Sequence, residues 1–258
     1  MLTADARAAG DAAGDAAGDG AKRRRIVLKM SGEALASASS EETIDAEVVE
    51  RFAGEIADVR SELDLELAIM VGGGNIWRGT TGQGKGLDRT TSDTMGMLAT
   101  VINALALQDA VERLGQPTRV LTAVHMAEVA EPYIRRRAIR HLEKGRVVIF
   151  AAGMGNPYFT TDTSAALRAA EIEAESLLKG THSGVDGVYS ADPKLDPSAV
   201  RFEALTFMDV INKDLRVMDM TAITFCKDNG LPVLVFDLMQ PGNLRRALAG
   251  EEIGTLIR

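Results

Sequence analysis

The sequence predicts an α/β fold: a mainly parallel central sheet covered by helices on both faces, in three layers. Apolar runs of strand length alternate with segments whose apolar residues recur every three or four positions, and this alternation is typical of such a fold. Short segments rich in glycine, lysine or hydroxyl residues follow several of the apolar runs. With 258 residues and 46% hydrophobic content, the chain is long enough to bury a sizeable core.

The first part of the alternation covers residues 26–152. Strands are predicted over 26–30, 65–71, 119–124 and 146–152. Helices are predicted over 45–63, from Ser92 or Asp93 to about Leu114, and over 132–143. Asp45 is suited to cap the first helix, because its carboxylate can accept hydrogen bonds from the free N–H groups of the first turn. Gly115 ends the second helix.

The second part continues with shorter elements. Helices are predicted over 163–174, 218–229 and 243–248, and strands over 176–179, 233–236 and 255–257. Residues 1–21 are almost entirely alanine, glycine and aspartate, with too little apolar surface to offset the entropy of ordering, so they are predicted to be a disordered tail. Residues 22–258 are predicted to form a single domain, with a phosphate-acceptor half up to about residue 170 and a nucleotide half after it.

The composition excludes some classes of function. A net charge of −8 and a pI near 5.1 argue against bulk attraction to nucleic acid or to an anionic membrane. The longest uncharged apolar stretch, 95–107, is too short to span a bilayer and is predicted to be a buried helix. The single cysteine, Cys226, is predicted to be a core residue and suits a reducing cytoplasm. Three scattered histidines, 125, 141 and 182, show no metal-ligand spacing.

The segments after the first strands have the chemistry of a phosphate site. Lys29 ends the first strand, and Ser31-Gly32 follow it, so that backbone N–H groups there can approach an oxyanion. Three glycines at 72–74 allow a tight turn or a close approach to a ligand, and Arg78 offers a bidentate partner for phosphate. Asp93 has two open interpretations: a helix cap, or an acceptor for sugar hydroxyls.

Two later segments extend this site. Residues 153–162 join a strand to a helix and carry hydroxyls and an amide suited to a polar ring or phosphate, with Asp162 placed to orient lysine or magnesium. In the segment 185–193, Tyr189 can stack on a base and Asp192 can meet ribose or a metal-bound phosphate. A capped loop and a solvated turn are the respective structural alternatives. Neither a P-loop nor a Rossmann fingerprint is present, so nucleotide binding would require another scaffold.

These motifs together resemble those of the bacterial UMP kinases, a branch of the amino-acid kinase family. The resemblance covers residues 25–258. It is carried by Lys29-Met30-Ser31-Gly32-Glu33, Gly72-Gly73-Gly74-Asn75-Ile76-Trp77-Arg78-Gly79, Asp93-Thr94-Met95-Gly96-Met97, Gly155-Asn156-Pro157-Tyr158-Phe159-Thr160-Thr161-Asp162 and Val185-Asp186-Gly187-Val188-Tyr189. The resemblance implies an amino-acid kinase-like sandwich that transfers a phosphoryl group from ATP to UMP, giving UDP and ADP in pyrimidine nucleotide biosynthesis. It also implies Mg²⁺ carried by ATP and a cytoplasmic homohexamer.

The resemblance also implies roles for individual residues. Lys29, Arg78 and Asp162 would be catalytic. The ATP-binding residues would be Lys29, Met30, Ser31, Gly32, Gly74, Arg78, Thr181, Tyr189 and Asp192. The UMP-binding residues would be Gly73, Asp93, Met154, Gly155, Asn156, Pro157, Tyr158, Phe159, Thr160 and Thr161. No protein side chain is assigned to a metal.

Three departures from the family pattern bear on this prediction. The segment 36–43 lacks the glycines of a loop linked to GTP activation, which speaks against GTP control, whereas inhibition by UTP is allowed. The segment 180–184 is longer than in many relatives, and Met154 replaces a threonine of some. Two alternative functions stay open: a nucleotide-binding regulator or storage protein without turnover, and a sibling kinase acting on aspartate, acetylglutamate or carbamate.

Overall fold

A single nine-stranded sheet forms the centre of the molecule. The computed structural model describes residues 23–37, 42–79, 84, 86–182 and 184–258; the predicted tail 1–21 and part of the segment 36–43 lie outside them. From edge to edge the strands are β4 (Glu131–Pro132), β3 (Thr118–Thr122), β5 (Val147–Ala151), β2 (Leu65–Val71), β1 (Arg24–Met30), β6 (Ser176–Thr181), β10 (Val233–Asp237), β11 (Thr255–Ile257) and β9 (Ala204–Leu205). Only β10 and β11 pair antiparallel within this sheet.

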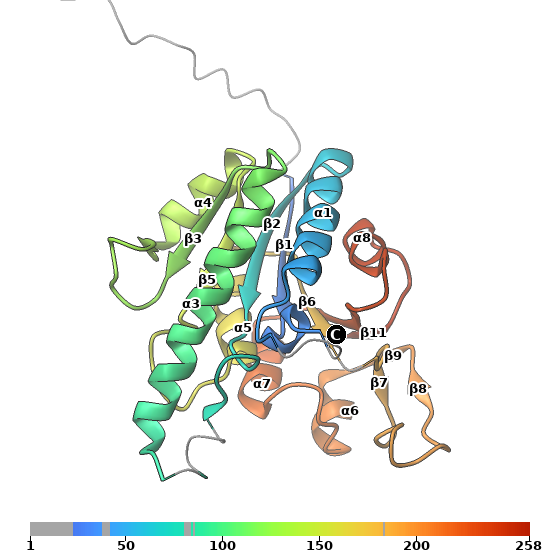
Figure 1. Ribbon diagram of the computed structural model, residues 1–258. Coiled ribbons are helices and arrows are strands. Elements are labelled where there is room, and N and C mark those ends of the chain that lie inside the picture. The colour runs from blue at the N-terminus through green and yellow to red at the C-terminus, as the bar shows by residue number, and fades with distance from the viewer. Residues whose placement is uncertain (1–22, 38–41, 80–83, 85, 183) are drawn as a thin grey trace, which may run out of the picture.

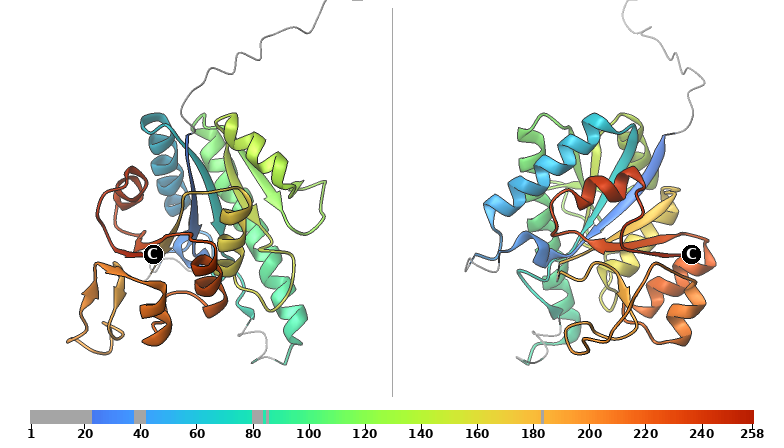
Figure 2. Two further views of the ribbon diagram at one scale, coloured as in Figure 1. Left: turned by 180° about the vertical axis from the view of Figure 1, so that it is seen from behind. Right: turned by 90° about the vertical axis from the view of Figure 1, so that its right-hand side faces the viewer.

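Helices cover both faces of the sheet, as Figures 1 and 2 show. One apolar cluster joins the sheet to α1 (Ala46–Glu62), α3 (Arg89–Arg113) and α8 (Asn243–Ala249). A second cluster on the opposite face includes α4 (Arg135–Glu143), α5 (Thr161–Glu171), α6 (Phe207–Asn212) and α7 (Met220–Asp228). Strand β1 serves both, since Ile26 and Leu28 belong to the first cluster and Val27 to the second. The predicted three-layer α/β fold is therefore confirmed.

Helix starts depend on local capping groups. Asp45 caps α1 as predicted, accepting hydrogen bonds from the N–H groups of Glu47 and Val48 at 3.0 and 3.2 Å. The predicted start of α3 at Ser92 or Asp93 is wrong, because Asp88 caps the helix through the N–H of Thr91 at 3.1 Å. Asp93 therefore lies inside the helix. Its interpretation as a helix cap is excluded.

Several short elements were not predicted or were misassigned. The helix expected over 132–143 begins at Arg135, because Glu131 and Pro132 pair with β3 as the edge strand β4. The two-stranded ribbon of β7 (Val188–Tyr189) and β8 (Arg201–Phe202) was also missed. Two-residue strands are too short to show a hydrophobic period. The short η1 turn (Gly32–Leu35) directly follows β1.

Helix α3 combines a buried and an exposed apolar face. Its 25 residues, with a mean hydropathy of 1.3 in the most apolar window, are long and apolar enough to cross a membrane. One such helix is weak grounds for a membrane span, because a core helix can have the same length and composition, and 44% of the window is buried. The buried face includes Val101, Ala104 and Leu107, whereas Leu98 and Ile102 are 47% and 50% exposed. The prediction of a buried helix holds for one face only.

The single cysteine lies where the sequence predicts. Cys226 in α7 is fully buried. Burial, together with the negative charges of Asp162 and Asp219, raises the pKa of its thiol to about 12. Cys226 is therefore a core residue, and its thiol stays protonated at neutral pH.

Candidate active site

Two lysines and one aspartate meet at the carboxyl ends of β1 and β6. Lys29 and Lys179 are partners in the register of these parallel strands, so their side chains leave the sheet on the same face. Asp162 lies in the first turn of α5, which Thr160 caps. Lys29 Nζ lies 2.8 Å from Asp162 Oδ1, and Lys179 Nζ pairs with Oδ2. The sequence predicted Lys29 and Asp162 here but not Lys179.

Burial and charge shift the pKa values of this cluster. Burial alone would raise the pKa of Asp162, but the ammonium groups of Lys29 and Lys179 more than offset it and hold the pKa below its usual value. Burial and the charge of Lys29 lower the pKa of Lys179 to about 8. Below that pH two positive charges share one carboxylate, which leaves a net positive charge. Such a group is suited to bind an anion.

A cleft of about 550 Å³ opens beside this cluster. It is bounded by the segments that follow β1, β2 and β5 and by the first turns of α3. The predicted site residues in its lining are Lys29, Ser31, Gly32, Gly73, Gly74, Arg78, Asp93, Met154, Asn156, Phe159, Thr160, Thr161 and Asp162. Four other predicted site residues are not part of the described lining: Met30, Gly155, Pro157 and Tyr158. Met30 is fully buried in the core. Lys29, Arg78 and Asp162 are thus brought to one cleft.

The glycines after β1 and β2 allow their loops to pack against each other. A Cβ at Gly32 would lie 2.7 Å from Gly74 N, and a Cβ at Gly73 would lie 2.8 Å from Gly96 O of α3. The N–H of Gly72 donates to Met30 O at 2.8 Å, so this group is not open to a ligand. At these positions the backbones lie too close for any side chain.

Glu33 joins the loops after β1 and β2. Its carboxylate accepts a hydrogen bond from the Ser31 hydroxyl and pairs with the guanidinium of Arg78. Burial opposes its charge, yet the Ser31 hydrogen bond and the charge of Arg78 lower the pKa of Glu33 below its usual value. The ion pair therefore holds Arg78 at the mouth of the cleft. Glu33 had no assigned role in the sequence prediction.

Asp93 connects α3 to the loop between β5 and α5. Its Oδ2 accepts hydrogen bonds from Arg89 Nε at 2.7 Å and from the N–H of Tyr158 at 2.9 Å. The guanidinium of Arg89 also lies over the Tyr158 ring, 5.2 Å from its centroid. Tyr158 has a φ of 72°, in the left-handed region that non-glycine residues rarely adopt. Arg89 and Asp93 thus hold this loop against α3.

A second cleft, of about 660 Å³, lies beyond the end of β6. The predicted nucleotide residues Thr181, Tyr189 and Asp192 line it, together with Lys194, Lys213 and Arg216. The Tyr189 hydroxyl donates to Asp186 Oδ1 at 2.7 Å, and the Thr181 hydroxyl donates to Val185 O at 2.6 Å. The two clefts share a boundary at His182, which lines both.

Comparison with known protein families matches residues 24–237 to the amino acid kinase family. The chain belongs to this family. The UMP kinase from Ureaplasma parvum is 38% identical and superposes with a TM-score of 0.86, over 92% of this chain and 99% of that one. The UMP kinase from Bacillus anthracis is 39% identical, with a TM-score of 0.86 over 91% and 96% of the chains. The uridylate kinase from Archaeoglobus fulgidus is 30% identical, with a TM-score of 0.68 over 90% and 99%.

The sequence prediction missed several residues that line or support the site. Lys179 carried a usable signal, because it occupies the end of a buried strand as Lys29 does. Arg89 and Glu33 were not recognised because their roles depend on contacts with Tyr158 and Arg78, which lie far from them in the sequence. His182 falls in the segment 180–184, which the sequence indicates to be longer than in many relatives.

Proposed function

We propose that this chain transfers the γ-phosphoryl group of ATP to UMP, giving UDP and ADP. The observation that carries the proposal is the buried Lys29–Asp162–Lys179 cluster beside the first of two adjoining clefts. The first cleft would hold UMP together with the phosphates of ATP, and the second cleft would hold the rest of ATP. The division into an acceptor half up to about residue 170 and a nucleotide half after it stays part of this proposal. The UMP kinases from Ureaplasma parvum and Bacillus anthracis, each matched over more than nine-tenths of this chain, support UMP as acceptor.

The cluster suits the charge changes of phosphoryl transfer. An oxygen of the UMP phosphate forms a bond to the γ-phosphorus while the bond to the β,γ-bridging oxygen breaks, and its electrons leave with ADP. The UMP phosphate is already an anionic nucleophile, so no base has to remove a proton. Lys29, Lys179 and Arg78 would stabilise the negative charge on the migrating group. Asp162 would hold the two lysines in place.

The remaining predicted contacts belong to the same proposal. The backbone of 30–32 and Gly74 would contact the ATP phosphates, and Thr181, Tyr189 and Asp192 the rest of ATP. Gly73, Asp93 and residues 154–161 would contact UMP. For Met30, Gly155, Pro157 and Tyr158, which the cleft lining does not include, the proposal rests on the family resemblance.

Magnesium is proposed to enter as part of the substrate MgATP. In the described part of the chain no group of three or more His, Cys, Asp or Glu side chains is arranged to hold a metal. Both oxygens of Asp162 face lysine ammonium groups, so its carboxylate is poorly suited as a metal ligand. Bound Mg²⁺ would neutralise phosphate charge, which adds to the effect of the lysines.

We propose a cytoplasmic homohexamer that acts in pyrimidine nucleotide biosynthesis. The exposed face of α3, with Met95, Leu98 and Ile102, provides apolar surface that contact between subunits would bury. Inhibition by UTP is part of the proposal and activation by GTP is not. Sedimentation velocity at several protein concentrations tests the assembly, and a monomer at all of them would contradict it.

The experiment that tests the function is ADP release from MgATP with different acceptors. We expect the fastest turnover with UMP, and slower or no turnover with CMP, AMP, aspartate, acetylglutamate and carbamate. Tight UMP binding without turnover would favour the regulator. Preferred turnover of a carboxylate or carbamate would favour the sibling kinase.

A further inference from the structure

His182 lies at the boundary between the two clefts. It follows β6, and within the described part of the chain it alone lines both cavities. The mechanism above assigns it no role. The phosphate chain of a nucleotide bound in the second cleft has to cross this boundary to reach Ser31, Gly32 and Gly74 in the first cleft. His182 is therefore placed beside the phosphate chain that carries the phosphoryl group.

Several charged side chains act on the imidazole of His182. Burial lowers its pKa, the carboxylate of Glu33 raises it, and the positive charges of Lys29, Arg78 and Lys179 lower it further, so that the net shift is downward. The ring is consequently neutral at neutral pH, with one N–H donor and one acceptor nitrogen. These four residues come from β1, the segments after β1 and β2, and β6.

We propose that His182 is a catalytic residue, which donates a hydrogen bond to an oxygen of the phosphoryl group during transfer. The inference rests on the proposed phosphoryl transfer. The imidazole keeps its proton throughout, and the bonds that form and break are those between phosphorus and the two nucleotide oxygens. Lys29 and Lys179 share Asp162, and Arg78 pairs with Glu33. A donor that is neutral before the substrates bind adds to these cations without repelling them.

The binding of phosphate groups should change the titration of the His182 imidazole. Negative charge from ATP and UMP opposes the effect of Lys29, Arg78 and Lys179, and favours protonation of the ring. The titration midpoint of His182 should therefore rise when both clefts are filled. A histidine that lies far from the bound phosphates would keep the same midpoint.

The first test is proton NMR of the histidine rings in the full chain. The sequence has three histidines, so single His→Gln variants assign every ring signal. We expect the His182 midpoint to rise when UMP and the β,γ-imido analogue of ATP are added together with Mg²⁺, while the midpoints of His125 and His141 stay constant. An unchanged His182 midpoint at saturating ligand would overturn the inference. This readout does not require turnover.

The second test compares H182L with H182Q in the UMP assay. We expect H182L to lower kcat about 10- to 100-fold, since one donor to the transition state is lost, with KM for UMP changed less than about twofold. H182Q should recover part of kcat, because its amide N–H can still donate. H125L, at an exposed site outside both cleft linings, is the control and should match the original chain.

The outcomes separate this inference from the proposed function. If the unaltered chain does not phosphorylate UMP, the proposed function fails. If it does and H182L retains full kcat, the function stands and the role of His182 fails. Thermal melting of H182L checks its fold, and rescue by H182Q distinguishes a hydrogen-bond donor from a residue that only packs.

Discussion

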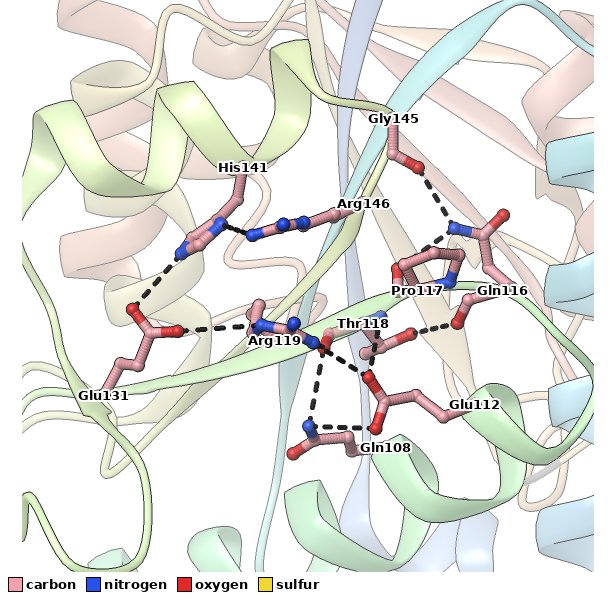
Figure 3. A network of polar contacts seen from close by, with 10 residues as sticks. All are labelled: Gln108, Glu112, Gln116, Pro117, Thr118, Arg119, Glu131, His141, Gly145 and Arg146. Atoms are coloured by element: carbon pink, nitrogen blue, oxygen red, sulfur yellow. Dashed lines mark hydrogen bonds and ion pairs between the residues drawn. The ribbon is translucent and has the colours of Figure 1, made fainter. Parts of the chain in front are cut away.

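Two polar clusters lie at opposite ends of the strands and differ in burial. At the carboxyl ends of β1 and β6, the side chains of Lys29 and Asp162 are only 10% and 11% exposed. Towards the amino ends of β3 and β5, a second network includes Gln108, Glu112, Gln116, Thr118, Arg119, Glu131, His141 and Arg146 (Figure 3). There the side chains of Arg119 and Glu131 are both 35% exposed.

The difference shows which end of the sheet is prepared for a ligand. In the amino-end network each charge meets a partner: Arg119 lies 2.9 Å from Glu112, and His141 Nε2 lies 3.2 Å from Glu131. Arg146 always donates, so His141 Nδ1, 3.0 Å away, accepts, and Nε2 carries the proton. The carboxyl-end cluster instead has two ammonium groups for one carboxylate, and so has positive charge left for a phosphate.

Removal of Lys29 should give the largest difference between the two clusters. We expect K29A to lower kcat for UMP phosphorylation about 1000-fold, because a buried positive charge next to the migrating group is lost. The Kd for UMP should change less than about tenfold. R119A, which removes a cation from the amino-end network, should leave kcat unchanged. Steady-state kinetics and calorimetric UMP binding measure both. An unchanged kcat in K29A would remove Lys29 from the mechanism.

Neutralising the shared carboxylate should affect both activity and stability. In D162N the buried ammonium groups of Lys29 and Lys179 would face each other, and we expect the free energy of unfolding to fall by about 3 kcal/mol. We expect kcat to fall about 100-fold, because the lysines lose the group that positions them.

The matched change in the amino-end network is E131Q. Because the side chains of Glu131 and its partner Arg119 are each 35% exposed, the unfolding free energy of E131Q should change by less than about 1 kcal/mol. Urea denaturation at pH 7 compares the two variants. Equal losses would show that burial is not what distinguishes the clusters.

The sequence was sufficient to predict most of the sheet but not its edges. The boundaries of β2 agree with the predicted strand 65–71, since a run that is apolar apart from Glu66 is typical of a buried strand. The edge strand β4 was read as the start of a helix, because two residues show no period and the pairing with β3 is a tertiary contact. Helix α3 begins before the predicted Ser92 or Asp93, because Asp88 is the residue that caps it.

The parts of the candidate site that could be predicted are those whose residues are neighbours in the sequence. Lys29, Ser31 and Gly32 form one such motif, and Asn156 to Asp162 another. Glu33 and Lys179 acquire their roles from partners more than fifteen residues away, and such contacts depend on the pairing of β1 with β2 and with β6. The glycines at 72–74 were predicted to allow a tight turn or a close approach to a ligand, and in the structure Gly72 and Gly73 mainly allow close packing of the backbone.

The lowered pKa of Lys179 predicts that kcat/KM for UMP falls about tenfold per pH unit at alkaline pH. The active form is protonated, so kcat/KM for UMP should be constant below the pKa of about 8 and fall as the pH rises above it. In K179R the guanidinium stays charged, and the fall near pH 8 should disappear whatever the rate at neutral pH. Initial rates between pH 6 and about 9.5 measure both profiles. The same fall in K179R would assign the titration to another group.

A comparison of two partly exposed arginines tests the smallest expected effect. Arg89 and Arg119 form similar ion pairs, with Asp93 at 2.7 Å and with Glu112 at 2.9 Å, but only Arg89 lines a cleft. R89A should raise KM for UMP about threefold to tenfold, because Asp93 and the Tyr158 loop lose their shared partner.

R89K should reverse part of this rise in KM, because lysine keeps the positive charge but lacks the planar contact to Tyr158. R119A should leave KM unchanged and alter the unfolding free energy by less than about 1 kcal/mol. If R89A and R119A behave alike, Arg89 is only a surface ion pair. A higher KM in R89A alone, with kcat retained, would show that an exposed pair matters where it positions a group that contacts the substrate.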